Sequence, residues 1–295
     1  MTQGLQGGFE APLPHLAQLR KVPQSTLLAI RIFVRMKTVW IAGASRGLGA
    51  ELARIASQQG HHVILSGRSK EALQEVRSTL PHPGNATVLP ADLTDETALL
   101  LLIDRVWFAT GRLDVVYFCA GLAQWSDPML THNNVEAQLF AVNYRFPVQA
   151  AKELAPRMAS QGSGHLVAIG SIAAEFGQPQ SAAYGASKAA LERHWEAFYA
   201  AWSPLGLKLQ LVQPGVIGTS IMQSALDESG LPLGKGAKTH AGMDPAEMAR
   251  RILKASRSNR FKIRIVSPSE RVALLLHRWM PTLFYTLLRK RHGTA

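Results

Sequence analysis

The sequence has little cysteine and no apolar run long enough to cross a membrane. Cys119 is the only cysteine among 295 residues, so the chain cannot close an internal disulfide or build a cysteine-rich metal site. We therefore expect a reducing, cytoplasmic environment and no bound metal. The apolar run at residues 27–34 is broken by Arg31, is shorter than the ~20 residues that span a bilayer, and lacks the cleavage site of a secretory signal.

Acidic residues are scarce at both ends of the chain, and the basic charge is concentrated there. The net charge is +12, and the segment from Arg250 to the C-terminus holds 12 Lys and Arg residues against one acid, Glu270. Nucleic acid is one partner of such a tail, but the sequence has no zinc-finger spacing, no RNP-like run and no basic segment interleaved with aromatics. We expect no nucleic-acid binding, and an anionic membrane surface is the better alternative.

A run of glycines follows the first strand-like segment. Residues 38–42 are apolar and β-branched, residues 50–59 have a helical pattern, and Gly43-Ala44-Ser45-Arg46-Gly47-Leu48-Gly49 lies between them. In this setting the glycines let the backbone approach a diphosphate, and the free N–H groups at the helix N-terminus meet its charge. The motif predicts a dinucleotide site formed by Gly43, Ser45, Arg46, Gly47, Leu48 and Gly49.

The second strand, residues 62–66, ends in Ser66-Gly67-Arg68 and offers no acidic residue. A site that prefers NAD usually has an acid here to bind the 2′-hydroxyl of the adenosine ribose. Arg46 and Arg68 instead offer two guanidinium groups that suit a 2′-phosphate. Each arginine alone is better explained as a solvated surface charge, but together, with no acid present, they favour NADP(H).

Strand-like and helical segments alternate along the rest of the chain. Further strands are predicted at residues 86–89, 114–119, 165–169, 208–212 and 262–266, with helices between them. Parallel strands joined by right-handed helical crossovers form a doubly wound sheet. We therefore predict an α/β fold of the Rossmann type with a seven-stranded parallel sheet and helices on both faces. The helical stretch 135–160 is predicted to be two helices, divided near Asn143 and Pro147.

This domain is expected to span residues 36–268. Residues 1–35 are predicted to be a disordered or non-native leader, because most of them are rich in Gly, Pro and Gln without periodicity. Residues 269–295 are predicted to form a basic amphipathic helical extension. Ligands of doubly wound sheets bind at the carboxyl ends of the strands. The residues that fall there are Gly43, Arg68, Asp92, Gly121, Ser171 and Pro214.

A tyrosine and a lysine occur four residues apart in Tyr184-Gly185-Ala186-Ser187-Lys188. In a helix these two side chains project from the same face, one turn apart. An ammonium group favours the phenolate, so we expect Lys188 to lower the pKa of Tyr184 from its usual value of about 10. Ser171 follows a buried strand and is placed to meet this pair over one carbonyl group. Taken alone, the spacing is better explained by an exposed helical pair, and the rest of the chain reverses that preference.

With these residues in view, the chain resembles the short-chain dehydrogenase/reductase family from about Met36 to Val266. The resemblance rests on the glycine turn and on markers that follow it in the family's order. These markers are Asp92-Leu93, Ala120-Gly121, Asn143, Ser171, Tyr184, Lys188 and Pro214-Gly215.

The resemblance implies a role for each of these residues. Tyr184 exchanges a proton with the substrate oxygen, Ser171 hydrogen-bonds the same oxygen, and Lys188 also holds the nicotinamide ribose. Asn143 resembles the residue that places a water behind Lys188. The remaining positions imply contacts with the cofactor: Asp92 and Leu93 beside the adenine, Ala120 and Gly121 where the cofactor approaches closely, and Pro214, Gly215, Ile217 and Thr219 around the nicotinamide.

The chain departs from the family pattern at Phe118-Cys119-Ala120-Gly121, where the family usually has Asn-Asn-Ala-Gly. The missing amides usually tie the central strands together, so this departure raises a question about local stability. Cys119 invites the hypothesis of a nucleophile. A buried small residue explains the position better, because no histidine partner is evident.

The segment 220–242 is rich in glycine and corresponds to the family's substrate loop, so we expect it to be mobile. Its apolar residues suggest a hydrophobic substrate, with plain core packing as an equal alternative. Trp125, Met129 and Trp195 are further candidates for the pocket wall, although core packing explains them better. The loop's apolar residues are Ile221, Met222, Leu226, Leu231 and Leu233.

Residues 270–291 repeat apolar side chains at helical spacing, with arginines off that stripe, and Pro281 is expected to kink or divide the helix. One reading is a helix that lies on a membrane surface. The other is a helix that covers the substrate cleft or contacts a second subunit.

Together these observations predict an NADP(H)-dependent oxidoreductase that interconverts a carbonyl and a secondary alcohol on an apolar small molecule, with the homo-oligomeric assembly common in the family. A nucleotide-binding sensor or scaffold of the same fold is the alternative, and its signature would be a broken Ser/Tyr/Lys set. A nucleotide-sugar epimerase would need a larger segment after Pro214.

Overall fold

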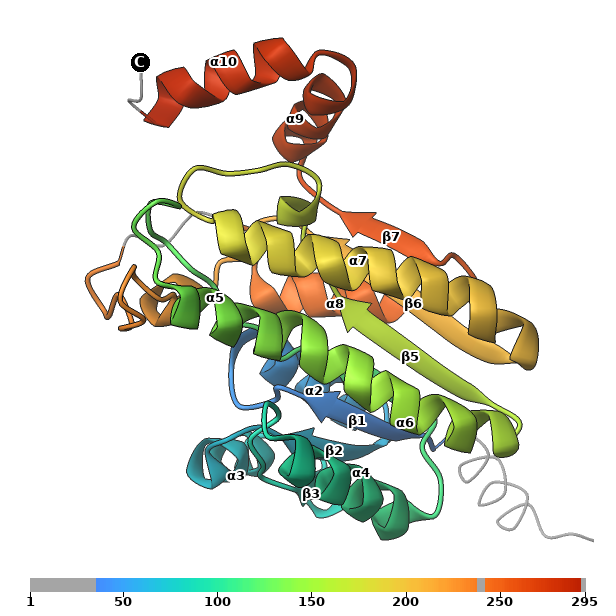
Figure 1. Ribbon diagram of the computed structural model, residues 1–295. Helices are drawn as coiled ribbons and strands as arrows, with labels where there is room; N and C mark the ends of the chain where they lie inside the picture. Colours follow the sequence, from blue (N-terminus) through green and yellow to red (C-terminus); the bar gives the residue numbers. More distant parts are fainter. Residues whose placement is uncertain (1–35, 238–241, 293–295) are drawn as a thin grey trace, which may run out of the picture. The chain divides into compact units, whose positions relative to one another are not determined.

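The computed structural model describes residues 36–237 and 242–292 (Figure 1). The leader predicted at residues 1–35 lies outside the described residues. Among the described residues, no helix is both long and apolar enough to span a bilayer.

The core of the fold is a seven-stranded sheet in which every neighbouring pair of strands is parallel. The strand order is β3-β2-β1-β4-β5-β6-β7, so the chain reverses its direction of winding between β1 and β4. The doubly wound sheet predicted above is therefore confirmed. The strands are β1 (Thr38–Ala42), β2 (His62–Ser66), β3 (Ala86–Val88), β4 (Val115–Phe118), β5 (Gly164–Ile169), β6 (Leu207–Pro214) and β7 (Lys262–Ile265).

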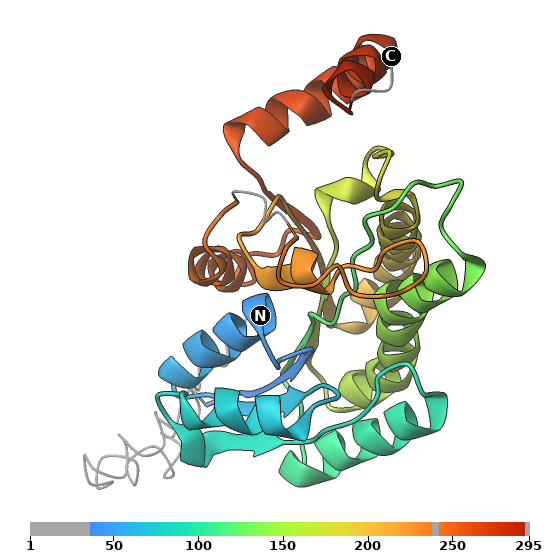
Figure 2. The same cartoon turned by 90° about the vertical axis from the view of Figure 1, so that its left-hand side faces the viewer.

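Helices cover both faces of the sheet. Figure 2 shows α2, α3 and α8 on one face, and α4, α5, α6 and α7 on the other. The helices before the C-terminal region are α2 (Gly47–Gln58), α3 (Lys70–Ser78), α4 (Glu96–Thr110), α5 (Asn133–Phe140), α6 (Phe146–Ser160), α7 (Ala182–Trp202) and α8 (Pro245–Ala255). Most predicted boundaries agree with these to within a few residues.

Two hydrophobic clusters fill the space between the sheet and its helices. Strand β1 contributes to both, because its side chains alternate between the faces: Trp40 packs with the α4, α6 and α7 side, and Ile41 packs with the α2 and α8 side. All five residues of β1 are buried. A strand buried on both faces carries an unbroken apolar run, which is the pattern that predicted it.

The helical stretch 133–160 contains two α-helices, divided near Asn143 and Pro147 as predicted, but the division is not a loop. Instead, a π-helical turn at Ala141–Arg145 joins α5 to α6. Pro147 lies in the first turn of α6, and its ring would clash with the carbonyl four residues earlier in a regular α-helix. A π-turn accommodates such a position and places Asn143 inside the fold, where it is fully buried.

Two helices follow the last strand, α9 (Pro268–Trp279) and α10 (Pro281–His292). We call this pair the C-terminal hairpin. Ser267 caps α9, and Glu270 completes the capping box. Pro281 divides the two helices, as one of the predicted alternatives states. Figure 1 shows α9 and α10 at the top of the view, next to the end of β7.

Candidate active site

A cavity of about 1210 Å³ lies at the carboxyl ends of the strands. Its position follows from the topology, because in a doubly wound sheet the loops leave a crevice where the winding reverses. The six residues predicted at strand ends all line this cavity, namely Gly43, Arg68, Asp92, Gly121, Ser171 and Pro214.

Ser171, Tyr184 and Lys188 all line this cavity. Ser171 follows β5 and caps a short 3₁₀-helix (Ile172–Ala174), with its Oγ accepting a hydrogen bond from the Ala173 amide at 3.1 Å. Tyr184 and Lys188 project from α7 one turn apart, as predicted. The hydroxyls of Tyr184 and Ser171 are hydrogen-bonded to each other, so the serine and the phenol form one polar unit.

The ionisation of this pair differs from the prediction. Burial raises the pKa of the Tyr184 phenol, and the hydrogen bond with Ser171 only partly opposes that effect. Burial also lowers the pKa of Lys188 to about 8, and its Nζ donates to the carbonyl of Ile169 at 2.9 Å. In the protein by itself, the prediction that Lys188 lowers the pKa of Tyr184 is therefore wrong, because desolvation dominates.

Asn143 ties the π-turn to two neighbouring elements. Its Oδ1 accepts from the Leu122 amide at 2.9 Å, and its Nδ2 donates to the Leu122 carbonyl at 2.9 Å and to Ser187 Oγ at 3.0 Å. Ser187 in turn donates to the Tyr184 carbonyl at 2.7 Å. The amide thus positions the turn of α7 that carries the tyrosine and the lysine. The sequence reasoning missed Ser187, whose only signal is its place directly before Lys188.

The glycine turn is packed too tightly for any other residue at two positions. Gly43 has a φ of +96°, and a Cβ there would lie 2.3 Å from the Ala120 nitrogen; a Cβ on Gly49 would lie 2.0 Å from the Gly43 carbonyl oxygen. Arg46, the N-cap of α2, makes no side-chain hydrogen bond to the helix. The N-terminal amides of α2 therefore face the cavity beside a backbone without side chains, which fits a diphosphate.

The predicted determinants of the 2′-phosphate lie at the same end. Arg46 and Arg68 are exposed and line the cavity. Leu93 and Asp92 line it as well. Partial burial opposes ionisation of Asp92, but hydrogen bonds from the Thr94 amide and hydroxyl and the charge of Arg68 lower its pKa. Arg46 and Arg68 can therefore bind an anionic group at this end of the cavity. The Asp92 carboxylate is fixed in place by the amide and hydroxyl of Thr94.

The segment after β6 forms the wall opposite the glycine turn. Pro214, Gly215, Ile217 and Thr219 all line the cavity, and a Cβ on Gly47 would lie 3.5 Å from the Thr219 methyl group. The two segments predicted to hold the cofactor therefore face each other across a narrow gap.

Glu270 of the C-terminal hairpin contacts this wall. One carboxylate oxygen accepts from the Val216 amide at 2.6 Å, and the other accepts from the Ser267 amide at 2.6 Å. The sequence reasoning missed this residue, whose only visible signal is its spacing from Ser267.

The unusual Phe118-Cys119 pair has a structural explanation. The Phe118 ring packs edge-on against Phe146 at 5.8 Å and against Trp195 at 5.6 Å. The amides of Cys119 and Ala120 both donate to the Ala42 carbonyl at 2.8 Å, which ties β4 to β1. Burial raises the pKa of Cys119 to about 12, which makes the thiol unsuited to act as a nucleophile.

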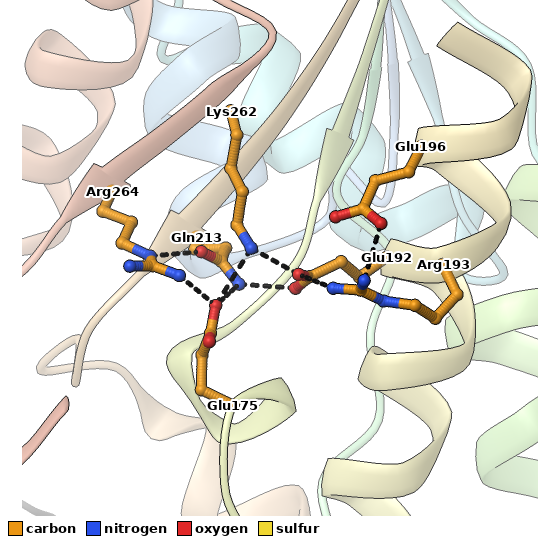
Figure 3. Close-up of polar contacts among 7 residues, drawn as sticks. All are labelled: Glu175, Glu192, Arg193, Glu196, Gln213, Lys262 and Arg264. Carbon is orange, nitrogen blue, oxygen red and sulfur yellow. Dashed lines mark hydrogen bonds and ion pairs between the residues drawn. The ribbon is translucent and has the colours of Figure 1, made fainter. Parts of the chain in front are cut away.

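A cluster of charged and amide side chains lies beside α7 (Figure 3). Glu175 follows the Ser171 turn, and Glu192 lies one turn beyond Lys188 on α7. Gln213 on β6 donates to both carboxylates, at 2.9 Å and 2.5 Å, and Lys262 on β7 forms ion pairs with both. We call these residues, with Arg264 on β7, the polar network. It fixes the Ser171 turn and α7 to the same two strands.

The other end of the cavity is apolar. Ile221, Met222 and Leu226 of the predicted substrate loop line it, whereas Leu231 and Leu233 do not. Residues 238–241 of that loop lie outside the described residues. Of the three further candidates, Trp125 lines the cavity, Trp195 is fully buried in the core and Met129 is 89% exposed.

The C-terminal hairpin contributes both apolar and polar residues to this end of the cavity. Phe284 is only 6% exposed, and its ring centroid lies 4.8 Å from that of Phe176. Hairpin residues that line the cavity are Ser269, Glu270, Ala273, Phe284, Leu288 and Arg291. One alternative from the sequence is a C-terminal helix that covers the substrate cleft. The side of the hairpin that lines the cavity agrees with this alternative.

Comparison with known proteins finds one family model and a set of similar sequences and structures. The family model described as short chain dehydrogenase matches residues 37–230. The Drosophila melanogaster protein named Dehydrogenase/reductase SDR family protein 7-like is 32% identical over 263 residues, which cover 86% of this chain and 80% of that relative. Dehydrogenase/reductase SDR family member 7B of Danio rerio is 30% identical and covers 88% of this chain and 86% of its own.

Solved structures share the same fold. A short-chain dehydrogenase from Streptomyces avermitilis superposes with a TM-score of 0.73 at 25% identity, covering 88% of this chain and 99% of its own. A Burkholderia phymatum protein in complex with NAD has a TM-score of 0.74 at 22% identity, covering 84% and 95%. One from Sphingobium yanoikuyae in complex with NADPH has a TM-score of 0.69 at 24% identity, covering 88% and 94%.

Proposed function

Because the chain belongs to the short-chain dehydrogenase family, we propose that it uses NADP(H) to interconvert a carbonyl and a secondary alcohol on an apolar small molecule. The observation that carries this proposal is the meeting of Ser171, Tyr184 and Lys188 in one cavity. One end of that cavity is a glycine turn with two arginines, and the other end is apolar.

The residues present fit a nicotinamide dinucleotide. The glycine turn and the amides of α2 would hold the diphosphate, Asp92 and Leu93 would lie beside the adenine, and residues 214–219 would hold the nicotinamide. When bound, the cofactor supplies or accepts the hydride, and the protein supplies position and electrostatics.

Tyr184 is the proton donor or acceptor in this proposal. Since burial raises its pKa, the phenol keeps its proton at neutral pH and is ready to donate it to a carbonyl oxygen. Ser171 hydrogen-bonds the same oxygen and polarises it. Lys188, whose pKa burial lowers to about 8, gives up and regains a proton close to neutrality. In this proposal Lys188 also binds the nicotinamide ribose.

Asn143 has two parts in the proposal. Its amide positions α7 through Ser187. Asn143 Oδ1 and Lys188 Nζ both lie close to Gly121. A Cβ built on Gly121 would be 3.6 Å from Asn143 Oδ1 and 3.8 Å from Lys188 Nζ, so the two groups border the same small space beside this glycine. A water held there would connect Lys188 with solvent and replace the proton that Tyr184 donates.

The preference for NADP(H) rests on this chain's own residues, since the solved structures of the same fold hold either NAD or NADPH. Arg46 and Arg68 are exposed at the cavity wall. No acidic residue follows β2 in Ser66-Gly67-Arg68. A 2′-phosphate would find two cations there, and a 2′-hydroxyl would find no carboxylate.

The test is a panel of carbonyl compounds, from short aldehydes to steroids and long-chain ketones, followed by the loss of NADPH absorbance. We expect turnover of apolar ketones. Tyr184→Phe should lower kcat by about 10²–10⁴-fold, the usual contribution of a positioned acid, and leave the Kd for NADPH unchanged. Rates in the variant equal to those of the unaltered enzyme would refute the assignment.

A further inference from the structure

The C-terminal hairpin has a second apolar side, which faces away from the cavity. Its exposed side chains follow helical spacing on α9 at Val272, Leu275 and Trp279, with exposed fractions of 64%, 53% and 73%. On α10, Leu283 and Leu287 are also exposed and lie four residues apart, one above the other on the helix. We call this set the outer face; it consists of Val272, Leu275, Trp279, Met280, Leu283 and Leu287.

The outer face is not needed to attach the hairpin to the rest of the chain. Attachment is made from the other side, where Phe284 packs on Phe176 with ring centroids 4.8 Å apart, and His277 packs on both rings. Glu270 adds hydrogen bonds to the amides of Val216 and Ser267. Exposed apolar side chains at helical spacing beyond those contacts are typical of a surface that binds something else.

The charges around the outer face are all of one sign. Arg271, Arg278, Arg289 and Lys290 are exposed, and no acidic residue occurs between Arg271 and His292. The nearest acid in the sequence, Glu270, is occupied by two backbone amides. None of the ion pairs found among the described residues includes any of these four cations.

Trp279 combines both properties of this surface. It is 73% exposed, and the guanidinium carbon of Arg278 lies 5.6 Å from its ring centroid. An amphipathic aromatic ring beside a cation, on a helix with an apolar stripe, is the composition that places a helix in the headgroup region of a bilayer.

We propose that the outer face of the C-terminal hairpin docks on an anionic lipid surface. The apolar strip would lie at the boundary of headgroups and acyl chains, and the four cations would meet lipid phosphates and carboxylates. The helices lie on the membrane and do not cross it, in agreement with the absence of a spanning helix among residues 36–237 and 242–292.

A second copy of this chain fits the outer face less well. In a two-fold dimer each residue meets the equivalent region of its partner, so the two sets of four cations would come together without an acid between them. An anionic surface removes that repulsion and also covers the apolar strip. Because Phe284 and Leu288 of the same hairpin line the cavity, docking would place the cavity next to the lipid.

The test is sedimentation of the full chain with vesicles of phosphatidylcholine alone or mixed with phosphatidylserine, at low and high salt. We expect binding to the mixed vesicles that weakens as salt rises. The triple variant Arg278→Gln/Arg289→Gln/Lys290→Gln should bind about 100-fold more weakly, since each basic residue near such a surface contributes about a fivefold factor. Trp279→Ser/Leu283→Ser should bind about tenfold more weakly or worse.

Matched controls come from α4, which carries an exposed aromatic residue and an exposed cation. Phe108→Ser, at a side chain that is 81% exposed, and Arg105→Gln should bind the mixed vesicles like the unaltered chain. Thermal unfolding of every variant checks that the fold is intact.

Three results would overturn the proposal. The first is equal sedimentation with and without phosphatidylserine. The second is a loss in the α4 variants equal to that in the hairpin variants. The third is a dimer in solution that Trp279→Ser/Leu283→Ser breaks, because a second copy would then be the occupant. None of these readouts depends on turnover, so they stand apart from the test of the proposed function.

Discussion

The two ends of the cavity are built in different ways. At the cofactor end the backbone itself forms the wall, with Gly43 against Ala120 and Gly49 against Gly43 at distances that exclude a Cβ. At the substrate end, side chains from the segment after β6 and from the C-terminal hairpin form the wall, as Met222 and Phe284 illustrate. The first end is therefore intolerant of added atoms, whereas the second can change its shape through side-chain substitution.

The strongest test of this contrast is Gly43→Ala. The added Cβ would lie 2.3 Å from the Ala120 nitrogen, at a φ of +96° that other residues rarely adopt. We expect a loss of NADPH binding of about 100-fold or more, and a stability loss of about 1–3 kcal/mol from overpacking. Calorimetric titration and thermal unfolding measure the two effects.

Gly84→Ala is the matched control, because a Cβ at Gly84 would meet no atom within 4 Å. It should leave both quantities unchanged. If Gly43→Ala bound NADPH as tightly as Gly84→Ala does, the wall at the cofactor end would be more adaptable than these distances indicate.

Arg68→Ala separates charge from shape at the same end. A hydrogen bond to a charged group contributes about 1.5–3 kcal/mol, so we expect the Kd for NADPH to rise by about 10–100-fold while that for NADH changes little. Fluorescence titration with both nucleotides measures this, with Arg105→Ala on α4 as the control. Equal losses for the two nucleotides would contradict a role in binding the 2′-phosphate.

The polar network joins the Ser171 turn and α7 to β6 and β7, and its contribution to stability depends on pH. Partial burial opposes ionisation of Glu175, but Gln213, Lys262 and Arg264 lower its pKa from the usual 4.5 to about 2. A carboxyl group whose pKa is lower in the folded state than in the unfolded state stabilises the fold at any pH above its unfolded-state pKa. This contribution to the free energy of unfolding is lost as the pH falls through the folded-state pKa. The contribution is thus complete above pH 4.5 and disappears towards pH 2.

Glu175→Gln should therefore lower the thermal midpoint at pH 7 by a few degrees and flatten its fall between pH 4.5 and 2. Glu136→Gln, at an exposed position on α5, is the control and should follow the unaltered chain. An unchanged acid limb in Glu175→Gln would mean that the network contributes no stability. This effect is the smallest of the three.

The contrast between the two ends also explains what the sequence could predict. The cofactor end depends on short-range patterns: β1, the glycine turn and α2 are consecutive, and the requirement for glycine at Gly43 and Gly49 is visible in the sequence itself. The strand ends then brought Asp92, Gly121 and Ser171 to the same edge, because parallel topology leaves few alternatives.

Other features depend on contacts between distant segments, which no local pattern encodes. Glu175 meets Lys262 and Arg264 across almost ninety positions of sequence, and Glu270 meets Val216 across 54. The sequence could not predict the raised pKa of Tyr184 for a similar reason. The pKa is raised by burial, and the burial of this phenol depends on all the segments that assemble around it. Likewise, the spacing of residues 133–160 cannot distinguish a helix break from a π-turn.

Glu270 has one further consequence. Its two carboxylate oxygens hold the Val216 amide beside the predicted nicotinamide site and the Ser267 amide at the start of the C-terminal hairpin. If a molecule that binds against one of these segments shifts the Glu270 carboxylate, the hydrogen bond to the other segment would change as well. Coupling between two binding sites is reciprocal. If bound nucleotide changes the affinity of the hairpin for a surface by some factor, binding to that surface changes the affinity for nucleotide by the same factor.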